Sequence, residues 1–274
     1  MVAEIRADFH LKQKRKSGQA EGEAGLKRKD EKKTRYLPAG DSALVVEFGN
    51  EIDEKLNTKV QQLAAKIIEA SRTALLSGVG EVIPTFRSLL VTYDPLRTDF
   101  EQLKNRLIKM EEELQEEKKT SRRILKIPCC YGGRYGLDLA DLMEYTGLSR
   151  EEIIERHSSA CYRIYMMGFL PGFAYLGGLD QKLEMPRLKT PRVKIPAGAV
   201  GIGGNQTGVY PIDSPGGWRL IGGTPVDFYD PEREEPILCK AGEFIRFVPI
   251  TMDDYYDIRH MILRKEYHVE VEEG

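Results

Sequence analysis

The chain has 274 residues, and its 41 lysines and arginines nearly balance 43 aspartates and glutamates, for a formal net charge of −2. This length allows one large domain or two ordinary ones, and the near-neutral charge argues against a nucleic-acid or membrane-surface partner. No apolar run approaches the roughly 18 residues of a membrane span, and no apolar signal core follows the first charges. We therefore expect a cytoplasmic protein.

The first segment, residues 1–35, differs in composition from the rest of the chain. It carries 11 lysines and arginines against six acids and few large apolar residues. Such a segment cannot bury enough apolar surface to offset the entropy of ordering, so a solvated, disordered tail is expected. A nucleic-acid or acidic-partner arm is the alternative, although no aromatic residues alternate with the basic ones as stacking on bases would require.

Residues 36–127 predict a small α/β domain. Strands are expected at 43–48, 79–83, 88–93 and 124–127 from their β-branched and aromatic content. Asp53 is placed to cap a first helix, and Thr98 with Glu101 predicts a capping box for a second. The resulting order is βαββαβ, the ferredoxin-like plan.

Residues 128–274 predict a β-rich domain with short helices at 138–145, 149–157 and 251–262. Ser149 with Glu152 forms a capping-box pattern. Short strands are expected at 162–166, 193–196, 199–203, 208–212, 218–221, 226–229, 237–239 and 244–248. Many short strands between glycine and proline turns are typical of a closed barrel or sandwich. The expected fold class is therefore α+β, with the ferredoxin-like domain first and the β-barrel domain after it.

The four cysteines, Cys129, Cys130, Cys161 and Cys239, lack the paired spacing of a zinc site. Without an export signal, free buried thiols are the expected state, and a redox or metal role is the alternative. We expect no bound metal in this chain.

Chemistry is expected in the stretch 163–225, where glycines and prolines alternate with apolar residues. Its first turn carries Phe169, Pro171, Phe173 and Tyr175, which could form the walls of a ligand pocket or close the end of the core. Both interpretations stay open on the sequence alone.

Two arginines in this stretch each follow a proline. The planar guanidinium forks of Arg187 and Arg192 suit a carboxylate or a phosphate. A surface ion pair is the alternative, and it weighs more for Arg187 than for Arg192. Arg192 is therefore our anion-binding candidate.

The remaining candidates follow on glycine-rich turns. Gln206 and Thr207 could recognise an amide or a carboxylate. The run from Ser214 to Trp218, with Gly216 and Gly217, could present backbone N–H groups to an anion or form a plain tight turn. His157 is a weak acid–base candidate against a structural alternative. No Ser/His/Asp or Cys/His set is evident, so covalent catalysis by this chain alone is not expected, and its catalytic residues stay unassigned.

These residues carry a resemblance to a known family. The runs GFLPGFAYL at 168–176, TPR at 190–192, PAG at 196–198, QT at 206–207, YP at 210–211 and SPGGW at 214–218 are similar to those of the allophanate hydrolase subunit 1 family. That family includes the B subunit of 5-oxoprolinase and KipI-type inhibitors of a sensor histidine kinase. The resemblance covers about residues 36–255, and it adds Tyr210 to the binding candidates.

The resemblance implies that the β-rich domain is a cyclophilin-like barrel. It also implies a non-autonomous enzyme component, which works with a C-type subunit and a LamB/YcsF-type A subunit. Together they would open 5-oxoproline to L-glutamate with ATP, and ATP with Mg²⁺ would bind in the assembled complex rather than tightly to this chain. The alternatives are a KipI-type kinase inhibitor and a partner in urea or allophanate carboxylation and hydrolysis.

Overall fold

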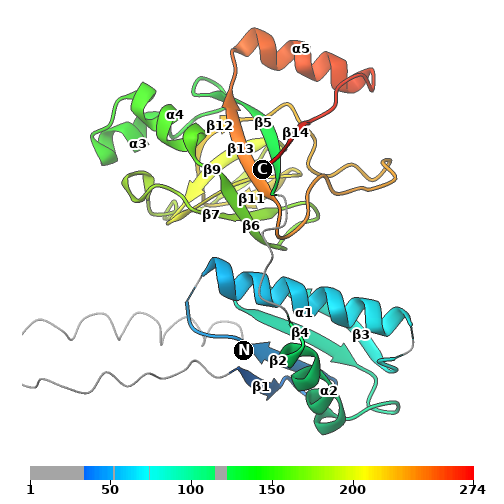
Figure 1. Cartoon of the computed structure of the whole chain (residues 1–274). Helices are drawn as coiled ribbons and strands as arrows, with labels where there is room; N and C mark the ends of the chain where they lie inside the picture. The colour runs from blue at the N-terminus through cyan, green and yellow to red at the C-terminus, as the bar shows by residue number, and fades with distance from the viewer. Residues whose placement is uncertain (1–33, 52, 74, 115–121) are drawn as a thin grey trace, which may run out of the picture. The chain divides into compact units, whose positions relative to one another are not determined.

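The computed structural model describes residues 34–51, 53–73, 75–114 and 122–274. Two sheets organise these residues, a four-stranded sheet and a larger barrel sheet (Figure 1). The basic tail expected at 1–35 falls almost wholly outside the described residues. Within those ranges, no helix has the length and apolar character needed to cross a membrane.

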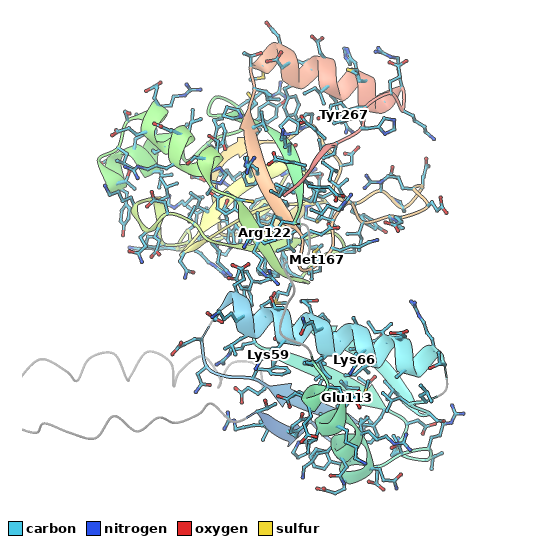
Figure 2. The ribbon with its side chains drawn as sticks, viewed as in Figure 1. Lys59, Lys66, Glu113, Arg122, Met167 and Tyr267 are labelled. Atoms are coloured by element: carbon cyan, nitrogen blue, oxygen red, sulfur yellow. The ribbon has the colours of Figure 1, made fainter. Side chains whose placement is uncertain are left out.

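The first sheet is antiparallel throughout, with strand order β1-β2-β4-β3. Its strands are β1 (Arg35–Pro38), β2 (Ala43–Glu47), β3 (Val79–Pro84) and β4 (Ser88–Tyr93), and its helices are α1 (Glu54–Arg72) and α2 (Phe100–Glu112). Alternate residues of β2 and β4 are buried, so one face of the sheet packs against the apolar stripes of both helices. Lys66 of α1 and Glu113 after α2 form an exposed ion pair at 2.8 Å, which adds little stability (Figure 2).

The starts of the two helices test the capping predictions. Asp53 caps α1 by accepting a hydrogen bond from the Leu56 N–H at 3.0 Å, as predicted. The cap of α2 is Asp99, which accepts from the Gln102 N–H at 2.8 Å, so the prediction of Thr98 as the cap is wrong. A carboxylate at the neighbouring position is an equally good acceptor and competes with the hydroxyl.

The complete βαββαβ plan is not found in this sheet. The expected sixth element, at 124–127, belongs to β5 (Arg123–Tyr131), which pairs with β12, β13 and β14 in the other sheet. In the first sheet, β1 pairs with the outer edge of β2 instead. The assignment of 124–127 to the first domain is therefore wrong, because strand content predicts a strand but not the sheet that it joins.

The second sheet closes on itself. Its order is β12-β9-β10-β7-β6-β13-β5-β14, and a further β12–β5 pairing joins the ends of a seven-stranded ring, with β14 attached outside it. Its strands are β5, β6 (Tyr162–Met167), β7 (Ala174–Gly177), β9 (Ala199–Gly203), β10 (Gln206–Val209), β12 (Arg219–Gly223), β13 (Phe244–Pro249) and β14 (Glu270–Glu273). Closure leaves the ring without free edges, which is how closed barrels protect their strands from aggregation. This architecture is consistent with the cyclophilin-like barrel that the resemblance implies.

Smaller elements surround the barrel. They are α3 (Leu139–Thr146), α4 (Arg150–Ser159), α5 (Met252–Leu263) and a two-stranded ribbon of β8 (Arg192–Ile195) with β11 (Ser214–Gly216). Ser149 caps α4 through a complete capping box with Glu152, as predicted. The strands expected at 226–229 and 237–239 are wrong, since only an isolated bridge joins Tyr229 and Ile237.

The inside of the barrel is mostly apolar. Its buried side chains include Leu125, Ile127, Tyr162, Ile164, Leu176, Val200, Ile202, Val209, Ile221, Ile245 and Phe247. All four cysteines are free thiols, as expected, but Cys161 is only partly buried. Burial raises the pKa of Cys239 to about 12, so this thiol stays protonated and unreactive at neutral pH.

Candidate functional site

The turn between β6 and β7 carries the first group of candidate residues. The Gly168 N–H donates to the Phe173 carbonyl at 3.2 Å, and the Phe173 N–H donates to the Leu170 carbonyl at 3.0 Å. Phe169 lies at the tip with a φ of 71°, a left-handed conformation that is strained for a bulky residue. Its side chain is 64% exposed. The turn therefore holds an aromatic ring out toward solvent at a conformational cost.

Five aromatic residues gather around this turn. Phe173 is at their centre, with its ring centroid 5.6 Å from that of Phe169, 5.0 Å from Tyr175, 5.5 Å from Tyr210 and 5.5 Å from Trp218. We call these five residues the aromatic cluster. Most of the ring pairs meet at steep angles, the edge-to-face arrangement that aromatic pairs favour. The structure thus brings the predicted aromatic candidates together on one side of the barrel.

Glycines on two barrel strands make room for Trp218. A Cβ on Gly203 of β9 would lie 2.4 Å from the indole nitrogen, and one on Gly208 of β10 would lie 3.1 Å from the far edge of the ring. These positions therefore need glycine because the indole packs directly on the backbone. Gln206 is opposite Gly203 in the β9–β10 ladder, so it shares the face on which the indole lies.

Arg187 reaches the same aromatic cluster. Its guanidinium carbon lies 5.7 Å from the centroid of the Trp218 ring, within cation–π range. Burial raises the pKa values of Tyr175 and Tyr210, and the positive charge of Arg187 opposes that rise in both. The guanidinium therefore lies close enough to both tyrosines to affect their pKa values.

Arg192, the predicted anion-binding residue, already has a carboxylate partner. Its two terminal nitrogens donate to the two oxygens of Asp138 at 2.8 and 2.9 Å. Asp138 also accepts from the Leu220 N–H at 2.6 Å, and only 5% of its side chain is exposed. Arg192 thus binds an anion, but this anion belongs to the chain itself. The sequence does not reveal Asp138 as the partner of Arg192, because the two residues are 54 positions apart.

His157 and Thr207 lie inside the barrel core, both fully buried. The Thr207 hydroxyl donates to the Gly201 carbonyl at 3.0 Å, so it must accept from Nε2–H of His157, 2.8 Å away. Nδ1 then accepts from the Tyr131 hydroxyl at 2.6 Å. Burial lowers the pKa of His157 to about 3, so the ring is neutral at physiological pH. These contacts favour the structural alternative for His157.

The remaining candidates lie on the ribbon and its turns. Ser214 pairs with Ile195 across the ribbon, and its buried hydroxyl has no hydrogen-bond partner among the described residues. A Cβ on Gly216 would lie 2.5 Å from the Tyr210 hydroxyl, so the turn passes directly over the aromatic cluster. The Gly217 carbonyl accepts from the Leu188 N–H at 2.7 Å. Pro171 is exposed at the turn beside Phe169.

Three surface cavities, of about 560, 470 and 400 Å³, lie away from the aromatic cluster. The first lies between α1 and α2, the second beside α4, and the third beside the end of α5; none of these three is lined by a residue of the aromatic cluster. Within the described ranges, no group of three or more His, Cys, Asp or Glu side chains is arranged to hold a metal ion. Within the cluster, Phe173, Tyr210 and Trp218 are buried, so the solvent-facing part consists of the exposed Phe169, the partly exposed Tyr175 and the exposed Arg187.

Comparison with known proteins relates this fold to characterised relatives. The family model described as "Carboxyltransferase domain, subdomain C and D" matches residues 34–239. The chain is 43% identical to the B subunit of 5-oxoprolinase from Bacillus subtilis (strain 168) over 227 residues, which cover 79% of this chain and 93% of the relative.

Solved structures agree with this relationship. TTHA0988 superposes with a TM-score of 0.66 at 36% identity, covering 76% of this chain; the match spans 40% of that longer chain. The K. lactis urea amidolyase matches with a TM-score of 0.72 over 88% of this chain and 16% of its own, and at 22% identity this supports the fold alone. The chain therefore belongs to the carboxyltransferase subdomain C and D family, also described as the allophanate hydrolase subunit 1 family, and it is similar to the B subunit of 5-oxoprolinase.

Proposed function

We propose that this chain is the B subunit of an ATP-dependent 5-oxoprolinase, which opens 5-oxoproline to L-glutamate. The observation that carries this proposal is the 43% identity to a protein of that name over 93% of the relative's length. The aromatic cluster supports it, because a five-membered lactam ring presents flat faces that pack on aromatic rings.

The reaction explains why such a chain would work with partners. A lactam carbonyl is a poor electrophile, so transfer of a phosphoryl group from ATP to its oxygen would supply a leaving group. This transfer releases ADP. A first water then attacks the carbonyl carbon, the ring C–N bond breaks, and the nitrogen takes up a proton and becomes the amine of glutamate, whose side-chain carboxyl still carries the phosphoryl group. A second water hydrolyses this acyl phosphate to the carboxylate and free phosphate. The steps need anion donors and restricted water access. We propose that ATP with Mg²⁺ binds in the assembled complex with a C-type subunit and a LamB/YcsF-type A subunit.

The role that we assign to this chain is binding and orientation. The exposed Phe169 and the partly exposed Tyr175 would pack against the ring of the substrate, and Gln206, on the same strand face as the buried Trp218, would hydrogen-bond the lactam amide. No side chain of the cluster is a nucleophile with an adjacent base. His157 is excluded from this role by its burial, which keeps it neutral inside the barrel core.

The test is reconstitution of the complex. This chain is co-expressed with the A-type and C-type subunits from the same genome, and ATP-dependent glutamate release from 5-oxoproline is measured. We expect activity that requires all three chains, and a loss of at least tenfold in kcat/KM for Gln206→Ala. Asn205→Ala, at an exposed neighbouring position, should behave like the wild type. A properly assembled complex without glutamate release would refute the proposal.

The second candidate function is inhibition of a sensor histidine kinase. The observation that favours it is Phe169, an exposed ring held in a strained conformation, which is typical of a side chain that anchors a protein partner. If this function is correct, the purified chain alone should bind the kinase and reduce its autophosphorylation, and Phe169→Ala should remove both effects.

A further inference from the structure

We propose that Arg187, rather than Arg192, is the arginine beside the aromatic cluster that binds an external oxyanion, a carboxylate or a phosphate of the ligand. This inference rests on the proposed function, because it assigns a ligand group to the same site. It follows from three features of the structure: the pairing of the neighbouring cations, the way Arg187 is held, and the surface that its guanidinium covers.

Pairing separates Arg187 from three other cations of this region, Arg192, Lys194 and Arg219. Arg192 is held by Asp138, Lys194 lies 2.7 Å from Asp213, and Arg219 donates to Asp141 at 2.8 Å. Within the described part of the chain, Arg187 has neither an ion pair nor a hydrogen-bond partner for its side chain. A charge-assisted bond to an incoming anion would therefore not compete with an acid of the chain.

The backbone holds Arg187 between two fixed neighbours. The Pro186 carbonyl accepts from Nε of Arg219 at 3.4 Å, and the Leu188 N–H donates to the Gly217 carbonyl at 2.7 Å. One residue earlier, Met185 exchanges backbone hydrogen bonds with Gly204. A side chain on such an anchored segment loses less conformational entropy when it binds a ligand than one on a free loop.

The position of the guanidinium leaves its donors available. It covers the Trp218 indole, which also contacts glycine backbone and the rings of Phe173 and Tyr210. A guanidinium that contacts an aromatic face still presents N–H groups at its edge, and two of them match the spacing of two carboxylate or phosphate oxygens. The side chain is exposed, so an oxyanion can reach that edge from solvent.

The chain contains a single tryptophan, Trp218, which makes it an internal reporter of this site. We propose to titrate the full-length chain with 5-oxoproline, with inorganic phosphate and with uncharged 2-pyrrolidinone while recording Trp218 fluorescence. We expect a saturable change with at least one oxyanion and none with 2-pyrrolidinone. A response to 5-oxoproline alone assigns the site to the substrate carboxylate, and a response to phosphate alone assigns it to a nucleotide phosphate.

Variants decide whether Arg187 causes the response. Arg187→Gln should weaken anion binding about ten- to a hundredfold, the range expected for loss of a charge-assisted bond. Arg187→Lys, which keeps the charge but lacks the fork, should fall between this variant and the wild type. Lys189→Gln is the matched control, because it removes the same charge two positions away. Lys189 is exposed and unpaired among the described residues, so this variant should bind the anion like the wild type.

Wild-type affinity in Arg187→Gln, or no saturable response of the wild type to either anion, would overturn the inference. Its failure can be told apart from failure of the proposed function. Glutamate release by the reconstituted complex with an unchanged KM in Arg187→Gln refutes the role of Arg187 alone. Arg187-dependent anion binding by a chain whose assembled complex releases no glutamate refutes the 5-oxoprolinase assignment alone.

Discussion

Two groups of aromatic residues in this barrel each contact one nitrogen-containing side chain. The two side chains differ in charge and in free hydrogen-bonding capacity. In the core, His157 contacts Phe247 and Tyr162, and both ring nitrogens have hydrogen-bond partners. At the aromatic cluster, Arg187 covers Trp218 and has no partner for its donors among the described residues. The first group is closed and neutral. The second also buries Phe173, Tyr210 and Trp218, but it is open at its edge, where Phe169 and the charged Arg187 are exposed.

The difference shows that residue type alone does not identify a site. Histidine is the more common catalytic residue, but complete burial with satisfied hydrogen bonds removes its ability to exchange protons at neutral pH. Arginine is the commoner surface residue, but an anchored guanidinium without a partner is prepared for a ligand. Free hydrogen-bonding capacity, rather than the presence of a titratable group, therefore distinguishes the two regions.

The largest loss of stability is expected when a side chain is removed from the closed group around His157. His157→Ala removes a buried ring and leaves the Tyr131 hydroxyl without its acceptor, so the free energy of unfolding should fall by about 3–5 kcal/mol. Urea denaturation followed by circular dichroism measures this change. His260→Ala, on the exposed side of α5, should change stability by less than about 0.5 kcal/mol.

The same residue predicts a pH dependence. The pKa of His157 is about 3 in the folded chain and about 6.5 when unfolded, so the unfolded state binds the proton more readily. Its stabilising effect is complete above pH 6.5 and is lost as the pH falls toward 3, by up to about 1.4 kcal/mol per pH unit. The stability difference between wild type and His157→Ala should shrink in this window; a constant difference would show that the ring is not held neutral.

An intermediate effect is expected at the ion pair beside the ribbon. Arg192→Ala leaves the buried Asp138 carboxylate with the Leu220 N–H and a longer ion pair to Arg219 at 3.9 Å, so a loss of about 2–3 kcal/mol is expected. Lys194→Ala breaks an exposed pair with Asp213 and should cost less than about 1 kcal/mol. Equal denaturation midpoints for the two variants would show that the pair of Arg192 with Asp138 contributes no more stability than an exposed ion pair.

The smallest effect on stability is expected at the exposed ring. Phe169→Gly relieves the left-handed strain but loses the contact with Phe173, and these terms nearly cancel, so we expect a change below about 1 kcal/mol. The activity of the reconstituted complex should nevertheless fall, because the exposed ring is the part of the aromatic cluster that is available to the substrate. Phe173→Ala, at the buried centre of the cluster, should cost about 3–5 kcal/mol and serves as the contrast.

Local features of the fold could be predicted from the sequence. Asp53 and Ser149 are caps whose hydrogen bonds span three residues, so their partners lie within the same short segment. The sheet that β5 joins depends on pairings with residues more than a hundred positions later, which no local pattern reveals. The prediction of a strand at 226–229 is wrong because Val226 and Phe228 are buried but do not pair with a neighbouring strand in a continuous ladder.

The candidate site divides in the same way. The turn at 168–175 predicted that Phe169, Phe173 and Tyr175 lie together, because its aromatic residues are adjacent in the sequence, but it did not predict that Tyr210 and Trp218 join them. The partners of Arg192 and His157 were not predictable, since Asp138 and Thr207 are 54 and 50 residues away from them. Pro186-Arg187 and Pro191-Arg192 look alike in sequence, and only the third dimension shows which guanidinium is free.

The pairing of β5 has a consequence for how the chain is made. β5 runs parallel to β13 over six residue pairs, from Ile124 opposite Phe244 to Cys129 opposite Pro249. During synthesis, about 120 further residues must therefore be added after β5 before β13, its parallel partner, exists. During that interval the incomplete barrel exposes an unpaired apolar strand, the kind of surface that chaperones bind and that aggregates at high concentration. Folding of the barrel is thus a late event in synthesis, and truncations before β13 should yield insoluble chains.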